Sequence, residues 1–435
     1  MKTSKILTAG ILAATALVST ASAVAPTKIY ITGSTAFRSV SNPQISALLS
    51  GTVTIASSDP SIGSANAAMW TGGKIGTIDV TIKAAWTGSA AGIQAVAANG
   101  LQSVQTKFLV DGATGTANLD PNDLLNPNPS FELATPDVCM ADNVQGSTPF
   151  LGGSSINGSV DNYQTLTPFQ VGVVSFTWAA SNGFPAGMSM NKKLVEKQFA
   201  GTGALLLGAY TGIATDMPKV APWTNVVYAT GRNPGSGTRI VTLAESGYGI
   251  DTFVSQWQPT SSGQNGTVSS MVLYPQTIIN GVDTVQDGNS GEETGGVLRD
   301  FLTNTLGTGA RQNSETGSSY LITYLGVGDY NKVKSGASGI TKPAVPLKWN
   351  GVDFSQLAVQ TGQYTFWGYE YLMYRPNLGT GAINSGNDPV KLTFASNLKT
   401  NILAATSATL SPNVALSDMR VTRAGDGGPV GNPNF

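Results

Sequence analysis

Histidine is absent from this chain of 435 residues. Without imidazole the chain cannot build a Ser-His-Asp or Cys-His catalytic site, and ordinary zinc sites lose their usual nitrogen ligand. The chain has one cysteine, Cys139, so it cannot form an internal disulfide, and we expect Cys139 to be a small buried apolar residue. We therefore expect a protein that is not an enzyme, with no catalytic residue, no metal and no cofactor.

Charged residues are also scarce, at 11% of the chain. Without the two lysines of a predicted leader, 24 − 2 = 22 basic residues face 25 acidic ones, a net charge of −3. That balance argues against nucleic acid or a membrane surface as a partner. Glycine is plentiful instead, at 52 residues, which is typical of an exported protein with many loops.

Residues 1–23 have the form of a secretory signal peptide. Lys2 and Lys5 form its basic end, an apolar run covers 6–18, and Ala21-Ser22-Ala23 is a small-residue cleavage site. No Leu-x-x-Cys lipid-attachment site follows, and no other apolar run approaches the length of a membrane span. We expect a periplasmic or secreted protein with no integral membrane segment after cleavage.

The most informative stretch is 225–247. A short β-type run at 226–229 leads into a loop that is too rich in glycine and proline to continue as a strand. Apolar residues then recur at helical spacing from Ile240 to Ala244, and Gly247 ends the pattern. The stretch therefore predicts a strand, a loop and a helix.

The start of that predicted helix is suited to an anion. Ser236, Gly237 and Thr238 lie where unpaired backbone N–H groups and the positive end of the helix dipole meet. Arg232 adds a fixed charge with a forked set of donors. A single Ser-Gly-Thr is more often an ordinary turn and N-cap, so this motif alone favours a structural interpretation.

Two further segments have the same design. A β-type run at 28–32 leads into Gly33-Ser34-Thr35-Ala36-Phe37 and a helical pattern, and a run at 80–86 leads into Thr87-Gly88-Ser89-Ala90 and another. Three strand–loop–helix units in one chain indicate helix N-termini that converge on one ligand.

The spacing Arg232-x-x-x-Ser236-Gly237-Thr238 resembles a motif of the phosphate-binding proteins of ABC transporters, which are type 2 periplasmic binding proteins. The resemblance extends thinly from about Lys28 to Tyr374. Pro234 stands where the family often has an acidic residue that pairs with the arginine.

Three shorter elements resemble the family in the same order. Gly33 to Phe37 is similar to its loop after the first strand, and Gly88 to Gly92 is similar to its Gly-Ser-x-x-Gly loop. Asp142, after the small-residue run 137–141, resembles the Asp that receives the ligand's proton. A long insertion, 101–136, separates these last two elements; we expect loop there, with a short hairpin around 107–110.

The resemblance implies an α/β, two-lobed type 2 periplasmic-binding-protein fold, in which each lobe is a mixed sheet flanked by helices, with loop-rich insertions. The expected organisation is a signal peptide at 1–23, a first lobe of 24–165 plus 328–423, a second lobe of 166–327 and a disordered tail at 424–435.

The resemblance also implies a function, which is to capture inorganic phosphate, or a similar oxyanion, between the lobes for ABC-type uptake, with an inner-membrane permease as a possible partner. The ligand-binding residues that it implies are Ser34, Thr35, Ala36, Phe37, Ser89, Asp142, Arg232, Ser236, Gly237 and Thr238.

Several alternatives stay open. A secreted structural or surface protein could keep this fold without transport, whereas a phosphatase is disfavoured because the sequence offers no metal cluster or activated nucleophile. Asp142 could merely cap a turn after its strand. Asp120 and Asp123 could bind calcium, although a solvated turn is favoured there.

Overall fold

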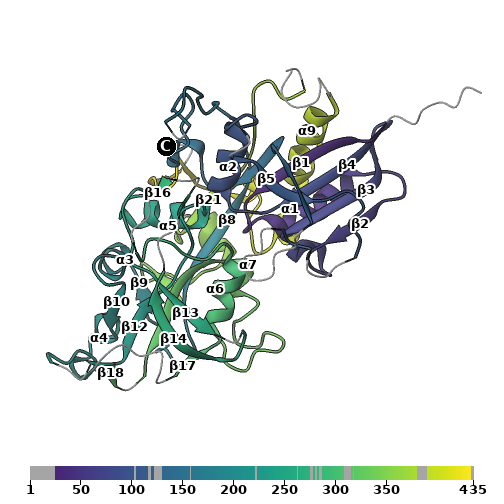
Figure 1. The fold of residues 1–435 in the computed structure, drawn as a ribbon. Coiled ribbons are helices and arrows are strands. Elements are labelled where there is room, and N and C mark those ends of the chain that lie inside the picture. Colours follow the sequence, from purple (N-terminus) through teal and green to yellow (C-terminus); the bar gives the residue numbers. More distant parts are fainter. Residues whose placement is uncertain are drawn as a thin grey trace, which may run out of the picture.

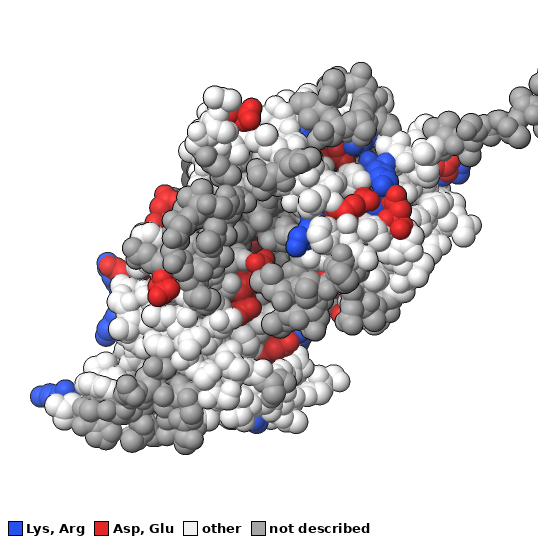
Figure 2. Space-filling model, in the orientation of Figure 1, with Lys and Arg blue, Asp and Glu red and all other residues white. Residues whose placement is uncertain are grey.

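The computed structural model describes residues 25–432 except 102–103, 116–118, 122–129, 157, 221–222, 262, 275–277, 280–281, 284–286, 308–314, 317 and 380–388. The predicted signal peptide and the last three residues lie outside the described residues. Charged side chains are sparse on the face shown in Figure 2 and lie in small groups of both signs.

A 12-stranded mixed sheet is the centre of the fold. In order across it, the strands are β10 (Ala204–Leu206), β12 (Val226–Ala229), β19 (Tyr320–Gly326), β8 (Thr167–Ala180), β21 (Trp367–Tyr374), β7 (Val138–Ala141), β1 (Thr27–Gly33), β4 (Ile78–Ala85), β3 (Ala67–Ile75) and β2 (Thr54–Ser57), with β20 (Val345–Trp349) beside β8 and β9 (Ser189–Met190) beside β20.

Helices and short sheets surround this sheet (Figure 1). The α-helices are α1 (Arg38–Leu48), α2 (Ser89–Ala97), α3 (Lys192–Phe199), α4 (Gly208–Thr211), α5 (Gly237–Ser246), α6 (Gly295–Leu302), α7 (Val327–Tyr330), α8 (Gln356–Gln360), α9 (Pro389–Ala404) and α10 (Ser407–Leu410). The short sheets are β5 (Thr106–Leu109) with β6 (Phe131–Ala134), β11 (Trp223–Thr224) with β18 (Glu315–Thr316), β13 (Trp257–Ser261) with β14 (Thr267–Leu273) and β17 (Thr305–Leu306), β15 (Ile278–Ile279) with β16 (Val282–Asp283), and β22 (Thr422–Arg423) with β23 (Val430–Gly431).

Strand β8 joins two halves of the molecule. Up to Ser175 it pairs with β21, which continues into β7 and β1, and from Phe176 to Ala180 it pairs with β19. Figure 1 shows one half around β1, β3 and β4 and the other around β10 and β12, with β8 and β21 between them. The predicted α/β architecture is confirmed; the predicted lobe boundaries at 165/166 and 327/328 stay a prediction.

The first half is built from parallel neighbours. Alternation in β1 places Ile29 and Ile31 in the core, and β1 lies parallel to both β4 and β7. In this register Gly33 pairs with Met140, so the carboxyl ends of β1 and β7 meet at one edge of the sheet. Ligand sites in such sheets form at the carboxyl ends of strands.

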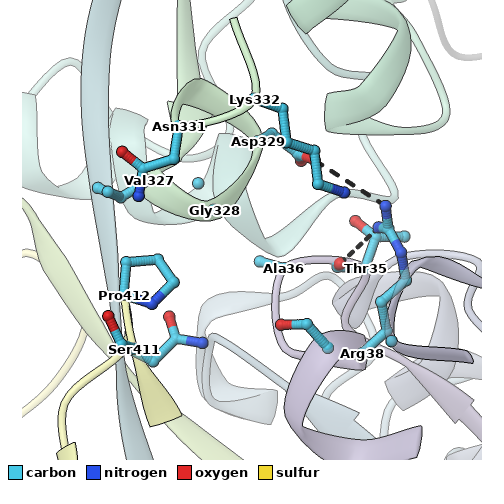
Figure 3. Close-up of a pocket in the computed structure, with 14 residues that line it drawn as sticks. Thr35, Ala36, Arg38, Val327, Gly328, Asp329, Asn331, Lys332, Ser411 and Pro412 are labelled. Carbon is cyan, nitrogen blue, oxygen red and sulfur yellow. Dashed lines mark hydrogen bonds and ion pairs between the residues drawn. The ribbon is translucent and has the colours of Figure 1, made fainter. Parts of the chain in front are cut away.

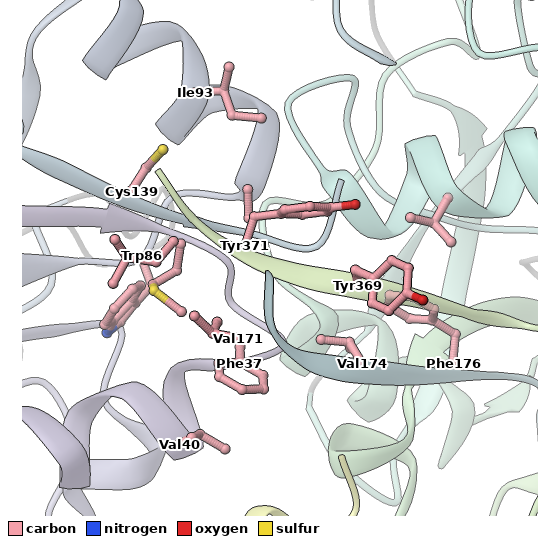
Figure 4. Packing of buried hydrophobic residues seen from close by; sticks show 14 of the residues in the cluster. Phe37, Val40, Trp86, Ile93, Cys139, Val171, Val174, Phe176, Tyr369 and Tyr371 are labelled. Atoms are coloured by element: carbon pink, nitrogen blue, oxygen red, sulfur yellow. The ribbon is translucent and has the colours of Figure 1, made fainter. Parts of the chain in front are cut away.

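The core runs continuously from one half to the other. Figure 4 shows Phe37 and Trp86 of the first half near Val171 of β8, with Phe176 and Tyr369 farther along the two joining strands. Cys139 is buried in this cluster, and its thiol is free, as the sequence predicts.

Within the insertion after α2, β5 and β6 form an antiparallel pair. The stretch predicted as a short hairpin around 107–110 is one strand of this pair, and its partner begins at Phe131. Lys83 of β4 is fully buried beneath the pair, and its ammonium lies 2.7 Å from Asp111 and 2.8 Å from Glu132. A buried cation needs such partners, so this ion network anchors the pair to the main sheet.

Residues 420–432, here called the C-terminal strap, pack across both halves. Asp426 Oδ2 accepts a hydrogen bond of 3.0 Å from the amide of Val144 in the first half. Arg423 lies 3.2 Å from Glu245 of α5 in the second half. The prediction of a disordered tail is therefore wrong for 424–432, because buried polar contacts hold a segment whose composition alone is typical of loops.

Candidate functional site

The ends of β1, β4 and β7 bring the first-half loops together. The amide of Ser34 donates to the carbonyl of Met140 at 2.8 Å, and the amide of Gly88 donates to the carbonyl of Gly33 at 2.9 Å. Gly88 directly precedes α2 and has φ +105°, a backbone conformation that residues with a side chain rarely adopt. The loop after β1 and the N-terminus of α2 are thus held at the same edge as Asp142, which follows β7.

The predicted strand–loop–helix of 225–247 forms as expected. Strand β12 covers the predicted residues, α5 begins at Gly237, and Gly247 ends it in the left-handed conformation, with φ 68°. The Ser236 hydroxyl accepts a hydrogen bond of 3.3 Å from the amide of Arg239. Ser236 is therefore an N-cap, so its hydroxyl has a structural role here.

The N-termini of α2 and α5 meet directly. The amide of Ala91 donates to the carbonyl of Gly235 at 3.1 Å. Asp142 Oδ1 lies so close to Gly237 that a Cβ at that position would overlap it. Only glycine permits this approach, so the first residue of α5 faces the carboxylate at the end of β7.

Asp142 lies at the centre of the candidate site and is 1% exposed. Its Oδ2 accepts a hydrogen bond of 3.2 Å from the Thr238 hydroxyl, and its amide donates to Ser89 Oγ at 3.2 Å. Its Oδ1 has no hydrogen-bond partner among the described residues. Desolvation raises the pKa of Asp142 to about 6, and the Ser89 hydroxyl and the charge of Arg232 oppose the shift.

Arg232 is 2% exposed and is held by backbone carbonyls. Its Nε donates to Glu292 O at 3.1 Å, and its Nη2 donates to Glu293 O at 2.6 Å. These carbonyls take the place of the acidic partner that Pro234 cannot supply. Desolvation lowers the pKa of Arg232, and the charges of groups that include Asp142 oppose the shift.

In the loop after β1, some residues are fully buried and others line a cavity. Ser34 is fully buried, and its hydroxyl has no partner among the described residues. Thr35 and Ala36 line a cavity (Figure 3), whereas Phe37 is fully buried against Gly172 in the core (Figure 4). The aromatic side chain of Phe37 therefore packs in the core rather than facing the cavity.

The structure thus brings together Ser89, Asp142, Gly237 and Thr238 in direct contact, with Ser236 next to them and Arg232 close enough to shift the pKa of Asp142. Ser34 immediately precedes Thr35 and Ala36, which line the cavity. Ligand contacts for these residues stay a prediction.

Sequence patterns missed Glu370. It is fully buried in β21, where Tyr371 pairs with Ala141, so the antiparallel register places Glu370 across from Asp142. Neither carboxylate oxygen of Glu370 has a hydrogen-bond partner among the described residues. Desolvation, followed by the charge of Asp142, holds its pKa well above the usual range. The sequence feature that could have pointed to Glu370 is that it is the one acidic residue in the aromatic-rich segment 364–374.

Asn143 was also missed. Its Oδ1 is buried without a partner within the described part of the chain and lies near Gly237. Asp142 Oδ1 and Asn143 Oδ1 are therefore buried acceptors without a donor among the described residues, whereas the Ser34 hydroxyl, itself a donor, acts on the Glu370 carboxyl and lowers its pKa against the effect of burial. A ligand that carries hydrogen-bond donors would satisfy the two acceptors.

Within the described ranges, no group of three or more Cys, Asp or Glu side chains could hold a metal ion. Asp123 of the candidate calcium pair lies outside those ranges. No described helix has the length and apolar character to cross a bilayer.

Searches of family models and of curated proteins return no match. Comparison with solved structures does return matches. The chain is similar to phosphate-binding proteins of ABC transporters. A substrate-binding protein of this kind from Clostridium perfringens, with bound phosphate, matches at 12% identity and a TM-score of 0.38, over 87% of this chain and 96% of that one.

Two further structures give comparable values. An ABC-type phosphate transport receptor from Vibrio cholerae matches at 10% identity and a TM-score of 0.39, over 89% of this chain and 99% of that one. PstS from Borrelia burgdorferi matches at 11% identity and a TM-score of 0.33, over 89% and 98%. With identities and TM-scores this low, the functional proposal depends on the residues of this chain.

Proposed function

We propose that this chain is a solute-binding protein whose two lobes close on a tetrahedral oxyanion, with inorganic phosphate as the ligand, and that it is not an enzyme. The observation that carries the proposal is the position of Asp142. Its buried carboxylate lies against the N-termini of α2 and α5, with Arg232 close enough to affect its pKa. Helix N-termini and an arginine attract an anion, while the carboxylate selects which anion enters.

The Asp142 carboxylate would distinguish anions by whether they carry a proton. A fully ionised anion would be repelled by Asp142 at close range in a site that excludes water. An anion that carries a proton would instead donate a charge-assisted hydrogen bond to it. Phosphate is protonated near neutral pH and sulfate is not, so the unpartnered Asp142 Oδ1 favours phosphate.

Export and transport form the finer part of the proposal. The signal-peptide pattern of 1–23 supports a periplasmic or secreted protein. The resemblance of the Arg232 to Thr238 motif supports ABC-type uptake, in which the closed form is presented to a permease. Closure would follow from contacts that exist only when both lobes reach the anion.

Retention of phosphate by the purified mature protein tests the proposal. We expect phosphate to be released on denaturation in an amount close to one per chain, and dialysis of the folded protein to remove it slowly. A protein that binds no phosphate after stripping and refilling, while keeping its native thermal transition, would contradict the proposal.

A second candidate is a secreted structural or surface protein. It is favoured by the contacts that join the halves through protein groups, namely Thr238 to Asp142, Ala91 to Gly235, and the C-terminal strap. Such a protein would assemble without dependence on anions. Sedimentation with and without phosphate distinguishes the two, because self-association unaffected by phosphate favours this candidate.

A further inference from the structure

A cavity of about 320 Å³ lies between the loop after β1 in the first half and α7, which packs against β19 and α6 of the second half. One wall is the loop after β1, with Thr35, Ala36 and Arg38, and the facing wall is the start of α7. The loop 411–413, near the C-terminus, closes a third side. Because both halves line it, a molecule bound there contacts both at once. A volume of this size exceeds what inorganic phosphate needs and is near the lower end of small-molecule sites.

One end of the cavity is charged. Figure 3 shows Arg38, Asp329 and Lys332 gathered there. Arg38 is held in place, because its Nη1 donates to Thr35 O at 2.6 Å and its Nε donates to Ser64 O at 3.1 Å. Its Nη2 faces Asp329 at 3.9 Å, longer than a hydrogen bond. The N–H groups of Nη2, fixed in the guanidinium plane, therefore make no hydrogen bond to Asp329 and remain open to a ligand.

Lys332 lies at the exposed rim of the same end, and its ammonium is 3.3 Å from Ser64 Oγ. Desolvation lowers its pKa, Asp329 opposes the shift, and the charges of Arg38 and Arg299 add to it. The charged lining residues are two cations, Arg38 and Lys332, and one anion, Asp329. This end of the cavity therefore carries a net positive charge.

The other end is neutral. Val327, Asn331, Ser411 and Pro412 lie there in Figure 3, which gives an apolar surface with amide and hydroxyl groups. Such a wall suits an uncharged body that carries hydroxyl groups. The cavity therefore has the polarity of a molecule with an anionic head and a polyhydroxylated body.

We infer that this cavity is a second ligand site, which binds a small sugar phosphate or polyol phosphate with its phosphate between Arg38 and Lys332. A tetrahedral phosphate offers oxygens in several directions, so two cations from different elements can each contact one. None of the described residues in contact with Asp142 lines this cavity. One link between the two places is Asp329, whose charge acts on Arg232. The ligand of the cavity would bridge the halves, as the proposed phosphate ligand does.

Gly328 provides a variant that fills the cavity. It lines the cavity from α7, and a Cβ there would lie 3.7 Å from the ring of Pro412, an ordinary contact. Gly328→Leu should therefore fold while occupying the space of the sugar. Gly431→Leu is the matched control, because that position is exposed and a Cβ there meets nothing within 4 Å. Lys332→Gln removes one cation, and Lys334→Gln is its exposed control.

The test is titration of the stripped mature chain with glucose 6-phosphate, glycerol 3-phosphate, glucose and inorganic phosphate. We expect a sugar or polyol phosphate to bind, and glucose not to bind. Gly328→Leu and Lys332→Gln should each weaken binding of the phosphate ester at least tenfold, whereas both controls stay within twofold. Binding of inorganic phosphate should change less than twofold in Gly328→Leu.

The outcomes separate this site from the proposed phosphate site. If neither ester binds, or if Gly328→Leu melts like the parent and binds them equally well, the cavity is not a ligand site. Inorganic phosphate binding by the same samples would then still support the proposed function. If Gly328→Leu and Lys332→Gln bind the esters like the parent, and only Arg232→Met loses them, the esters occupy the Asp142 site and the second site is refuted.

Discussion

The hydroxyl of Thr238 donates a hydrogen bond of 3.2 Å to the carboxylate of Asp142, which lies 96 residues earlier in the chain. The two residues belong to opposite halves, since Asp142 follows β7 and Thr238 is in the first turn of α5. The candidate site therefore exists only where the halves meet. Binding at this contact and closure of the lobes are expected to be one event.

Arg232→Met should weaken phosphate binding by about 2–4 kcal/mol, because the other donors near Asp142 are neutral. It should also lower the melting temperature, since the carbonyls of Glu292 and Glu293 lose their donor. Titration and thermal unfolding of the same sample separate the two effects. Normal affinity in the folded variant would place the arginine outside the site.

The hydroxyls of Ser89 and Ser236 should behave differently. Ser236→Ala should lose about 1 kcal/mol of stability, because Ser236 caps α5 through the amide of Arg239. Ser89→Ala should weaken phosphate binding by about 1–2 kcal/mol, because Ser89 Oγ positions Asp142. Chemical unfolding and titration of both variants check this. A Ser89→Ala variant that binds normally would show that its hydroxyl serves only the fold.

Glu370→Gln should change how stability depends on pH. Burial keeps the pKa of Glu370 well above its usual value, so the folded chain retains a proton that the unfolded chain releases above about pH 4.3. The stability of the parent should therefore fall as pH rises from about 4 to 8, because the folded state binds more protons. The variant lacks this ionisation and should gain stability relative to the parent at pH 8. Urea unfolding at both pH values is the measurement, and an equal difference at both would contradict the assignment.

The C-terminal strap should stabilise the contact between the halves. Asp426→Asn keeps the shape but weakens the bond to the Val144 amide, so we expect a loss of about 1–2 kcal/mol of unfolding free energy. Asp251→Asn, at an exposed position outside the strap, controls for the loss of one carboxylate. Small-angle scattering should show a more open molecule for the Asp426 variant; an unchanged envelope and unchanged stability would mean that the strap does not hold the halves.

Local patterns predicted much of the fold. The strand at 226–229 and the end of α5 at Gly247 were predictable, because a β-type run, helical spacing and a C-terminal glycine are patterns of residues close in sequence. The same holds for the strand before Asp142.

Long-range contacts were not predictable in this way. Glu370 comes to lie across from Asp142 only through pairing between strands more than 200 residues apart in the sequence, and no local pattern reports such pairing. The side chain of Phe37 fills the core against Gly172 of β8, a contact that no local pattern reports, and the contact of Phe37 with a ligand stays a prediction. The C-terminal strap was missed for the same reason, because its order comes from Val144 and Glu245.

The Asp142 site is tested most directly by titrating the stripped mature protein and its Asp142→Asn variant with phosphate and with sulfate at neutral pH. The account predicts that the parent binds phosphate at least about tenfold more tightly than sulfate, a difference of about 1.4 kcal/mol. The variant should bind phosphate only modestly less well and should accept sulfate, since the repelling charge is gone. A parent that binds sulfate as tightly as phosphate, or a folded variant that still rejects sulfate, would contradict it.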